Sequence, residues 1–248
     1  MIPTMSIGTI QKRATDTASR AVGTASALPG KVRRRLDARR IRSRVTLYDL
    51  EQAGWEGVRP AFVLSTGRSG TRLLSDLLEQ VKGVDVHHAP RPELITASKA
   101  AFERIEEPGE LPRFVDLLKA AREDMLRQSV RYGHRYVEPN CRITFLAPAC
   151  DAAYPGSYFL HIVRHPAAIV RSGAERGWYS GRHDHDSGRI VPLPGTPEAE
   201  LWAGWDPVDR IGWLWDETTR FVERLAERVG DGRVAIVRAE DLFRDAGI

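Results

Sequence analysis

Short apolar runs alternate with helix-length segments along most of this sequence, and the alternation limits the folds open to it. The runs are bounded by glycine, proline or polar residues, and they lie at 61–64, 84–86, 136–137, 158–163 and 234–237. Helical patterns lie at 113–130, 143–153, 166–173 and 208–229. Strands that are separated by helices pair in parallel, because each crossover returns the chain to the same edge of the sheet. We therefore expect an α/β fold of three layers (α/β/α), with a central parallel sheet of about five strands.

Length and charge favour one folded domain that is preceded by a basic tail. A chain of 248 residues suits a single α/β domain with a substantial core. Residues 1–45 hold eleven Lys and Arg against two Asp, and the whole-chain net charge of +4 therefore leaves −5 for the remainder. We expect residues 1–45 to lack fixed structure and residues 46–248 to form the folded domain. Because nucleic-acid binding depends on a basic surface, the acidic domain argues against a nucleic-acid partner.

The basic tail is relevant to where the protein is located in the cell. Its segment 30–44 carries apolar residues among arginines, a pattern typical either of a solvated tail or of a helix that contacts anionic lipid. No apolar run approaches the roughly 20 residues that span a bilayer. The N-terminus lacks a secretory signal pattern. We expect a cytoplasmic protein, with peripheral membrane contact through the tail as the alternative.

The segment 62–74 has the pattern of a buried strand, a turn and an amphipathic helix. Gly67 and Gly70 allow the backbone of the turn to wrap closely around a tetrahedral anion, toward which the helix N-terminus points. Further donors come from the side chains of Arg68, Ser69 and Thr71. We interpret the turn as a phosphate- or sulfate-binding site. The GxxxxGK[ST] pattern is absent, which disfavours a metal-dependent kinase or ATPase.

A second anion-binding pattern follows the run at 158–163. Arg164 ends this run, Pro166 suits the first turn of a helix, and Ser172 falls about two turns into that helix. A guanidinium supplies the charged fork that phosphate prefers, and a serine hydroxyl supplies one more donor. The sequence thus predicts two anion sites at the ends of two strands.

These segments resemble a known family. The stretch 65–74 resembles the 5′-phosphosulfate loop of sulfotransferases that use 3′-phosphoadenosine 5′-phosphosulfate (PAPS), in the bacterial type with Arg in place of Lys. The stretch 158–173 resembles the family's 3′-phosphate motif, and 233–242 resembles its last core strand. The resemblance implies a P-loop-like fold for 46–248. Family members usually continue beyond the segment that 233–242 resembles, so this domain is either a minimal member or one that lacks the usual C-terminal end. It implies PAPS binding at Gly67, Arg68, Ser69, Gly70, Thr71, Arg72, Arg164 and Ser172.

The resemblance also assigns catalytic roles. Arg68 would stabilise the leaving phosphate, and a base would take the proton of the acceptor. The run at 84–86 delivers histidine and glutamate to the edge where a parallel sheet binds ligands, so the candidates, in order, are His88, Glu93 and Glu138. No metal is expected, because a sulfuryl group carries less charge than a γ-phosphate, and Cys141 and Cys150 fit reduced core thiols.

The expected function is transfer of a sulfuryl group from PAPS to a hydroxyl or amine of a carbohydrate, lipid or small-molecule acceptor. The alternatives are a nucleotide or small-molecule kinase on a P-loop scaffold, and a non-catalytic nucleotide-binding module. Residues 180–206 show no period, and so long a loop is typical of a lid or a binding surface. Trp178, Trp202 and Trp205 are the candidates for acceptor contact, whereas Trp213 and Trp215 fit core packing.

Overall fold

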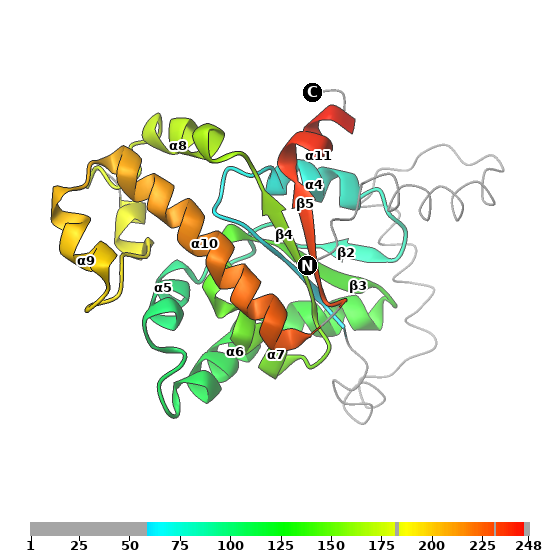
Figure 1. Ribbon diagram of the computed structural model, residues 1–248. Coiled ribbons are helices and arrows are strands. Elements are labelled where there is room, and N and C mark those ends of the chain that lie inside the picture. Colours follow the sequence, from blue (N-terminus) through cyan, green and yellow to red (C-terminus); the bar gives the residue numbers. More distant parts are fainter. Residues whose placement is uncertain (1–58, 182–183, 231, 246–248) are drawn as a thin grey trace.

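A five-stranded parallel sheet forms the centre of the protein (Figure 1). The computed structural model describes residues 59–181, 184–230 and 232–245. The strand order is β2-β3-β1-β4-β5, and every neighbouring pair is parallel. The strands are β1 (Ala61–Leu64), β2 (Val84–Val86), β3 (Arg135–Pro139), β4 (Tyr158–Val163) and β5 (Val234–Arg238). The predicted α/β class is confirmed, and each of the five apolar runs forms a strand.

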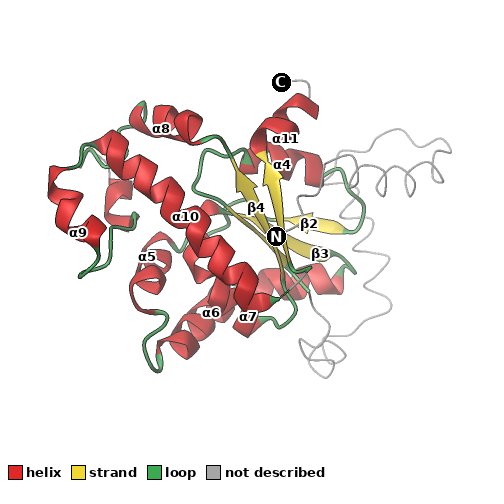
Figure 2. Cartoon of the chain, viewed as in Figure 1, coloured by secondary structure: helices red, strands yellow, loops and turns green. Residues whose placement is uncertain are grey.

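Helices cover the sheet (Figure 2). The α-helices are α4 (Thr71–Leu78), α5 (Ile95–Arg104), α6 (Glu110–Arg131), α7 (Ala147–Ala153), α8 (Pro166–Ala174), α9 (Pro197–Leu201), α10 (Pro207–Val229) and α11 (Ala239–Asp245). Short 3₁₀ helices are η1 (Cys141–Leu146), η2 (Asp184–Gly188) and η3 (Trp202–Gly204). The tail at 1–45 and the domain start at 46 lie outside the described residues.

Alternate residues of the strands face two different cores, because successive side chains of a strand point to opposite faces. Phe62 and Leu64 of β1 pack against α6, α7 and α10 in one buried cluster. Val63 lies in a second cluster, with Leu74 of α4 and Phe243 of α11 packed against it. The helices therefore lie on both faces of the sheet, as the three-layer prediction required (Figure 1).

The strand order reverses at β1, which lies between β3 and β4. In open α/β sheets, ligands bind in the crevice outside the carboxyl end of the strand where the order reverses. The turn that follows β1 occupies this position, and the end of β4 lies next to it. The topology thus places both predicted anion sites at the same edge of the sheet.

Three elements differ from the sequence-based expectation. Helix α5 was missed because its buried residues are Ser98 and Ala101, which produce no apolar stripe. The segment 143–153 was expected to be one helix, but it begins as η1, in which the Asn140 side chain accepts a hydrogen bond from the amide of Arg142. Pro148 then lies in the first turn of α7, where its missing N–H costs no hydrogen bond. The region 180–206 contains η2, α9 and η3 rather than one long loop.

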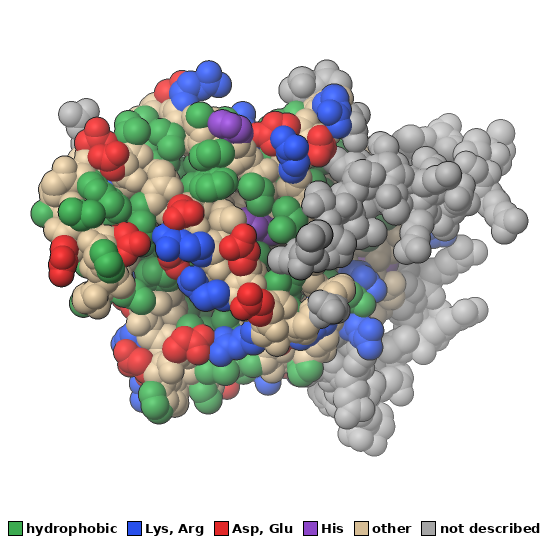
Figure 3. All heavy atoms as spheres, in the orientation of Figure 1, with side chains coloured by type: hydrophobic (Ala, Val, Ile, Leu, Met, Phe, Trp, Pro, Cys, Tyr) green, Lys and Arg blue, Asp and Glu red, His purple; other side chains and the backbone are tan. Residues whose placement is uncertain are grey.

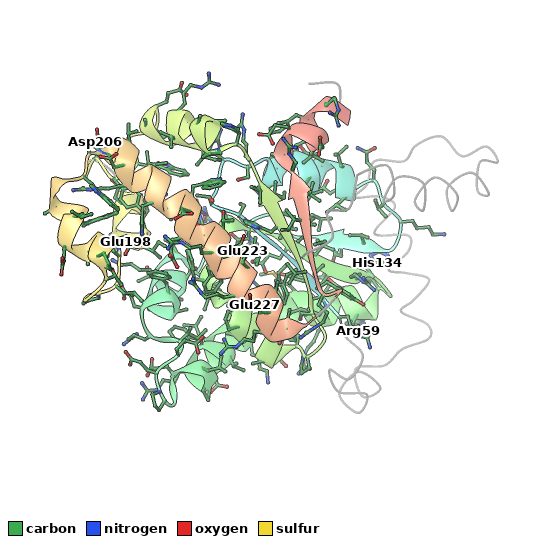
Figure 4. The ribbon with its side chains drawn as sticks, viewed as in Figure 1. Arg59, His134, Glu198, Asp206, Glu223 and Glu227 are labelled. Atoms are coloured by element: carbon green, nitrogen blue, oxygen red, sulfur yellow. The ribbon has the colours of Figure 1, made fainter. Side chains whose placement is uncertain are left out.

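Helix α10 crosses one face of the protein and has a well-defined start. The Asp206 side chain accepts hydrogen bonds from the amides of Val208 and Asp209, and Asp209 completes a capping box. Figure 4 shows Asp206 at this end of α10, with Glu223 and Glu227 farther along it. Basic and acidic side chains are interspersed over the face seen in Figure 3. On α10, Arg220 pairs with Asp216 at 2.7 Å. None of the described helices is long and apolar enough to cross a membrane.

Candidate functional site

The turn between β1 and α4 has the backbone geometry of an anion-binding loop. Gly67 and Gly70 have φ angles of 95° and 98°, and Arg68 between them has a φ of 59°. Such angles strain residues with side chains, so glycine suits the two extreme positions. No side chain among the described residues caps α4, which begins directly after Gly70. The first amides of α4 are therefore available to an anion.

Neighbouring groups hold the turn tightly. The amide of Gly67 donates a hydrogen bond of 3.2 Å to the Ser65 hydroxyl, and the amide of Ser65 donates one of 3.2 Å to the Thr144 hydroxyl. A Cβ atom at Gly67 would lie 3.3 Å from the Trp178 ring. Glycine at position 67 thus meets a steric as well as a conformational requirement.

The second anion motif meets the first. Nη1 of Arg164 donates a hydrogen bond of 3.0 Å to the carbonyl oxygen of Arg68. Nε of Arg68 donates one of 3.3 Å to the Ser172 hydroxyl, to which Nη1 of Arg176 also donates, at 3.1 Å. Burial, followed by the charges of Arg176 and Arg164, lowers the pKa of Arg68. Two guanidinium groups therefore donate to one serine hydroxyl, and a third donates to the main chain of Arg68 beside it. This arrangement suits a multiply charged anion.

His88 lies on the other side of the turn. Its Nε2 atom is 3.4 Å from the Thr71 hydroxyl oxygen. Burial, followed by the charge of Arg72, lowers the pKa of His88 below its ordinary value of 6.5. The ring is therefore neutral at neutral pH and can accept a proton.

The other two candidate bases have cationic partners. Glu93 forms an ion pair with Arg142 at the pocket wall. Glu138 is fully buried and receives two hydrogen bonds from Arg122, at 2.8 and 3.0 Å, and one from the Tyr136 hydroxyl, at 2.7 Å. The carboxylate of Glu138 does not line the pocket. This geometry gives Glu138 a structural role and leaves His88 and Glu93 as candidates.

A pocket of about 590 Å³ opens at the turn. Of the predicted site residues, it is lined by Gly67, Arg68, Thr71, His88 and Glu93. Arg164 and Ser172 do not line the pocket, but both form hydrogen bonds with Arg68, which does. The volume is within the usual range for small-molecule sites.

Two residues of the predicted loop point elsewhere. The hydroxyl of Ser69, which was expected to donate to the anion, is buried and donates to the carbonyl oxygen of Gly67 at 3.2 Å. The guanidinium of Arg72 is exposed and pairs with Asp76 at 3.2 Å. Their roles in cofactor binding stay predictions.

The tryptophans divide differently from the sequence-based hypothesis. Trp178 lines the pocket, and its contact with an acceptor stays a prediction. Trp202 and Trp205 do not line it; they form an edge-to-face pair, and Trp202 also packs against Trp213. Trp215 donates a hydrogen bond of 2.9 Å from its ring nitrogen to the carbonyl oxygen of Arg164, and so supports the second motif.

Several pocket residues were not anticipated from the sequence. The basic ones are Arg176, Lys99, Arg142 and Arg189. Arg176 lies two residues beyond the end of α8, so only its closeness to Ser172 in the sequence signalled its position. The other three come from separate elements, and no local sequence pattern marks them as pocket residues.

Cys141 and Cys150 are both free, and Cys141 lines the pocket. Within the described residues, no group of three His, Cys, Asp or Glu side chains could hold a metal ion.

Comparison with known proteins gives matches among solved structures alone. No protein-family model and no curated protein matches the chain. A sulfotransferase from Alicyclobacillus acidocaldarius is 20% identical, with a TM-score of 0.49 over 76% of each chain. The sulfotransferase domain from the curacin biosynthetic pathway is 17% identical, with a TM-score of 0.48 over 76% of this chain and 70% of that one. A sulfotransferase from Mycobacterium tuberculosis H37Rv is 16% identical, with a TM-score of 0.43 over 88% of this chain and 71% of that one. All three structures are named as sulfotransferases.

Proposed function

We propose that the protein transfers a sulfuryl group from PAPS to a hydroxyl or amine of a carbohydrate, lipid or small-molecule acceptor. One observation carries the proposal: the turn at Arg68 and the motif at Arg164 and Ser172 are joined by direct hydrogen bonds at the ends of neighbouring strands. Two joined anion sites suit a nucleotide that carries charged groups at both its 5′ and 3′ positions. A nucleoside triphosphate carries all its charged groups in one run of phosphates at the 5′ position, so it needs only one anion site.

The reaction moves one group and one proton. The acceptor oxygen or nitrogen forms a bond to sulfur, and the bond between sulfur and the bridging oxygen of the 5′-phosphate breaks. The acceptor proton passes to a base, and the electron pair of the broken bond stays on the phosphate of adenosine 3′,5′-bisphosphate. Negative charge therefore grows on the bridging oxygen, as it does in phosphoryl transfer.

Arg68 and the turn stabilise that charge. Arg68 lines the pocket and carries a permanent positive charge. The uncapped start of α4 adds main-chain donors in a fixed orientation. Because these groups are held by Ser172, Arg164 and Ser65, little reorganisation is needed when the charge develops.

We assign the base to His88 rather than Glu93. The Glu93 carboxylate is engaged by Arg142, and proton transfer to it would weaken this ion pair. His88 has a lowered pKa and lies beside Thr71 at the mouth of the turn. His88 is thus the better placed proton acceptor at neutral pH.

Calorimetry and a transfer assay test the proposal together. We expect adenosine 3′,5′-bisphosphate to bind, ATP with magnesium to bind more weakly, and labelled sulfate to move from PAPS to an acceptor panel. Arg68→Ala should abolish transfer while circular dichroism remains unchanged. Tighter binding of ATP with magnesium would favour a kinase, and bisphosphate binding without transfer would favour a non-catalytic module.

Cytoplasmic location and membrane contact through residues 1–45 remain part of the proposal, and fractionation of the full chain tests both.

A further inference from the structure

The pocket continues past the turn into a space that the donor motifs do not use. Its walls come from α5, η1, residues 188–190 and α10. Four apolar side chains line it, one from each wall: Ile95, Phe145, Ile190 and Leu214. Three of them, Phe145, Ile190 and Leu214, are buried at 7%, 2% and 5% exposure, so this apolar wall is part of the packed core. Such a surface suits an apolar ring or chain.

Cations line the same space. Lys99, Arg142 and Arg189 reach it from α5, η1 and the segment after η2. Among the described lining residues, Glu93 is the only carboxylate. The charges of Arg142, Arg189 and Arg68 all act to lower the pKa of the Cys141 thiol, against the burial that raises it. The pocket is therefore positive around Cys141, although the chain beyond residue 45 carries a net charge of −5.

Local contacts hold two of these cations in place. Nε of Arg189 donates to Asp186 at 3.1 Å, and its guanidinium lies 3.9 Å from the centre of the Trp178 ring. Arg142 is paired with Glu93. Each guanidinium has five N–H donors, so both keep donors beyond those used by a single carboxylate.

Lys99 is the least neutralised of the three. Its Nζ atom donates to the main-chain carbonyl of Ser187 at 3.3 Å, and Glu103 is 3.9 Å away. The ammonium group has three donors. A ligand anion can therefore bind to Lys99 without displacing a close carboxylate.

We infer that the acceptor carries an anionic group on an apolar body, as a hydroxylated aryl or acyl carboxylate does. Lys99 binds the anion, Arg142 and Arg189 flank it, and the wall of Ile95, Phe145, Ile190 and Leu214 takes the apolar body. The hydroxyl is then directed to the end of the pocket where His88 lies. The inference rests on the proposed function in treating this part of the pocket as the acceptor side.

A matched pair of ligands tests the inference by binding alone. The acid 3-(4-hydroxyphenyl)propionate and its methyl ester differ in charge and keep the same apolar body. Both are titrated into the full-length protein, with and without saturating adenosine 3′,5′-bisphosphate. We expect the acid to bind at least about tenfold more tightly than the ester, as a charge-assisted hydrogen bond allows.

Lys99→Met removes the ammonium and keeps an apolar stem, and it should abolish most of this preference. Lys82→Met, at an exposed lysine that does not line the pocket, should keep it. Equal binding of acid and ester, no binding of either, or an undiminished preference in Lys99→Met would overturn the inference. If the wild-type protein does not bind the bisphosphate, the proposed function itself is wrong, and this result is distinct from the outcomes above.

Discussion

Nη1 of Arg164 donates a hydrogen bond of 3.0 Å to the carbonyl oxygen of Arg68, across 96 positions of sequence. The guanidinium of Arg164 also lies 5.1 Å from the centre of the Phe243 ring. Arg164 thus supports the turn proposed to bind one end of the donor, and the proposed function assigns its remaining N–H groups to the other end. This side chain links the two predicted anion sites directly.

Arg164→Met should weaken binding of adenosine 3′,5′-bisphosphate by about tenfold to a hundredfold, because charge-assisted hydrogen bonds to phosphate are lost. Calorimetry measures the change. Arg171→Met is the matched control, since Arg171 is an exposed arginine on the same helix, α8, and does not line the pocket. Equal affinity in both variants would remove Arg164 from the donor site.

His88→Gln should lower kcat by about a hundredfold or more, because general base catalysis contributes factors of this size. Affinity for the bisphosphate should change little, since no anion contact is assigned to this ring. Steady-state kinetics and calorimetry separate the two effects. A larger loss of kcat in Glu93→Gln than in His88→Gln would transfer the role of base to Glu93.

The same assignment predicts the acid limb of the pH profile. Burial and the charge of Arg72 lower the pKa of His88, so the ring stays neutral down to a pH below 6.5. The rate should fall only below that pH, as the ring becomes protonated. Arg72→Gln removes a charge that lowers this pKa, and it should move the limb to higher pH; a limb that does not move would argue against His88.

Glu138→Gln should destabilise the fold by about 3–5 kcal/mol, because it leaves the fully buried Arg122 without its charged partner. Urea denaturation measures the loss. Arg228→Ala breaks an exposed ion pair with Glu106 and should cost at most about 1 kcal/mol. Similar losses in the two variants would contradict the structural role of Glu138.

His161 should make stability depend on pH. Burial between β1 and β5 lowers its pKa to about 4, from 6.5. The unfolded chain therefore binds a proton that the folded chain does not, between these two values. Stability from this group is complete above pH 6.5 and falls by about 1.4 kcal/mol per unit as the pH drops toward 4.

His161→Leu should flatten that part of the curve of unfolding free energy against pH. Parallel urea titrations of both proteins from pH 4 to 7 measure the difference. Identical slopes would show that His161 is protonated equally in the folded and unfolded chains.

The five strands and the turn at 65–71 could be predicted because their signals are local. A run such as Phe62 to Leu64 and the glycines that follow it are adjacent in sequence, and burial of a parallel strand requires an unbroken apolar run. Helix α5 could not be predicted, since small residues form its buried face.

The residues of the two predicted anion motifs were easier to identify from the sequence than the basic residues of the neighbouring pocket wall. The residues at 67–71 and at 164–172 come in two compact motifs. Lys99, Arg142 and Arg189 come from three elements, and only tertiary packing brings them to one pocket. Trp202 and Trp205 show the reverse case, because their position in the expected lid suggested acceptor contact for rings that pack against their neighbours.

The hydrogen-bonded pairing of β1 with β4 has a consequence for how such a protein can diversify. Neighbouring strands lie about 4.8 Å apart whatever their side chains are, so the backbone fixes the spacing of the two predicted anion sites. Helix α5 and the residues at 188–190 do not contribute to that spacing. Under the proposed function, substitutions there would change which recipient molecule is bound and leave the spacing of the anion sites as it is.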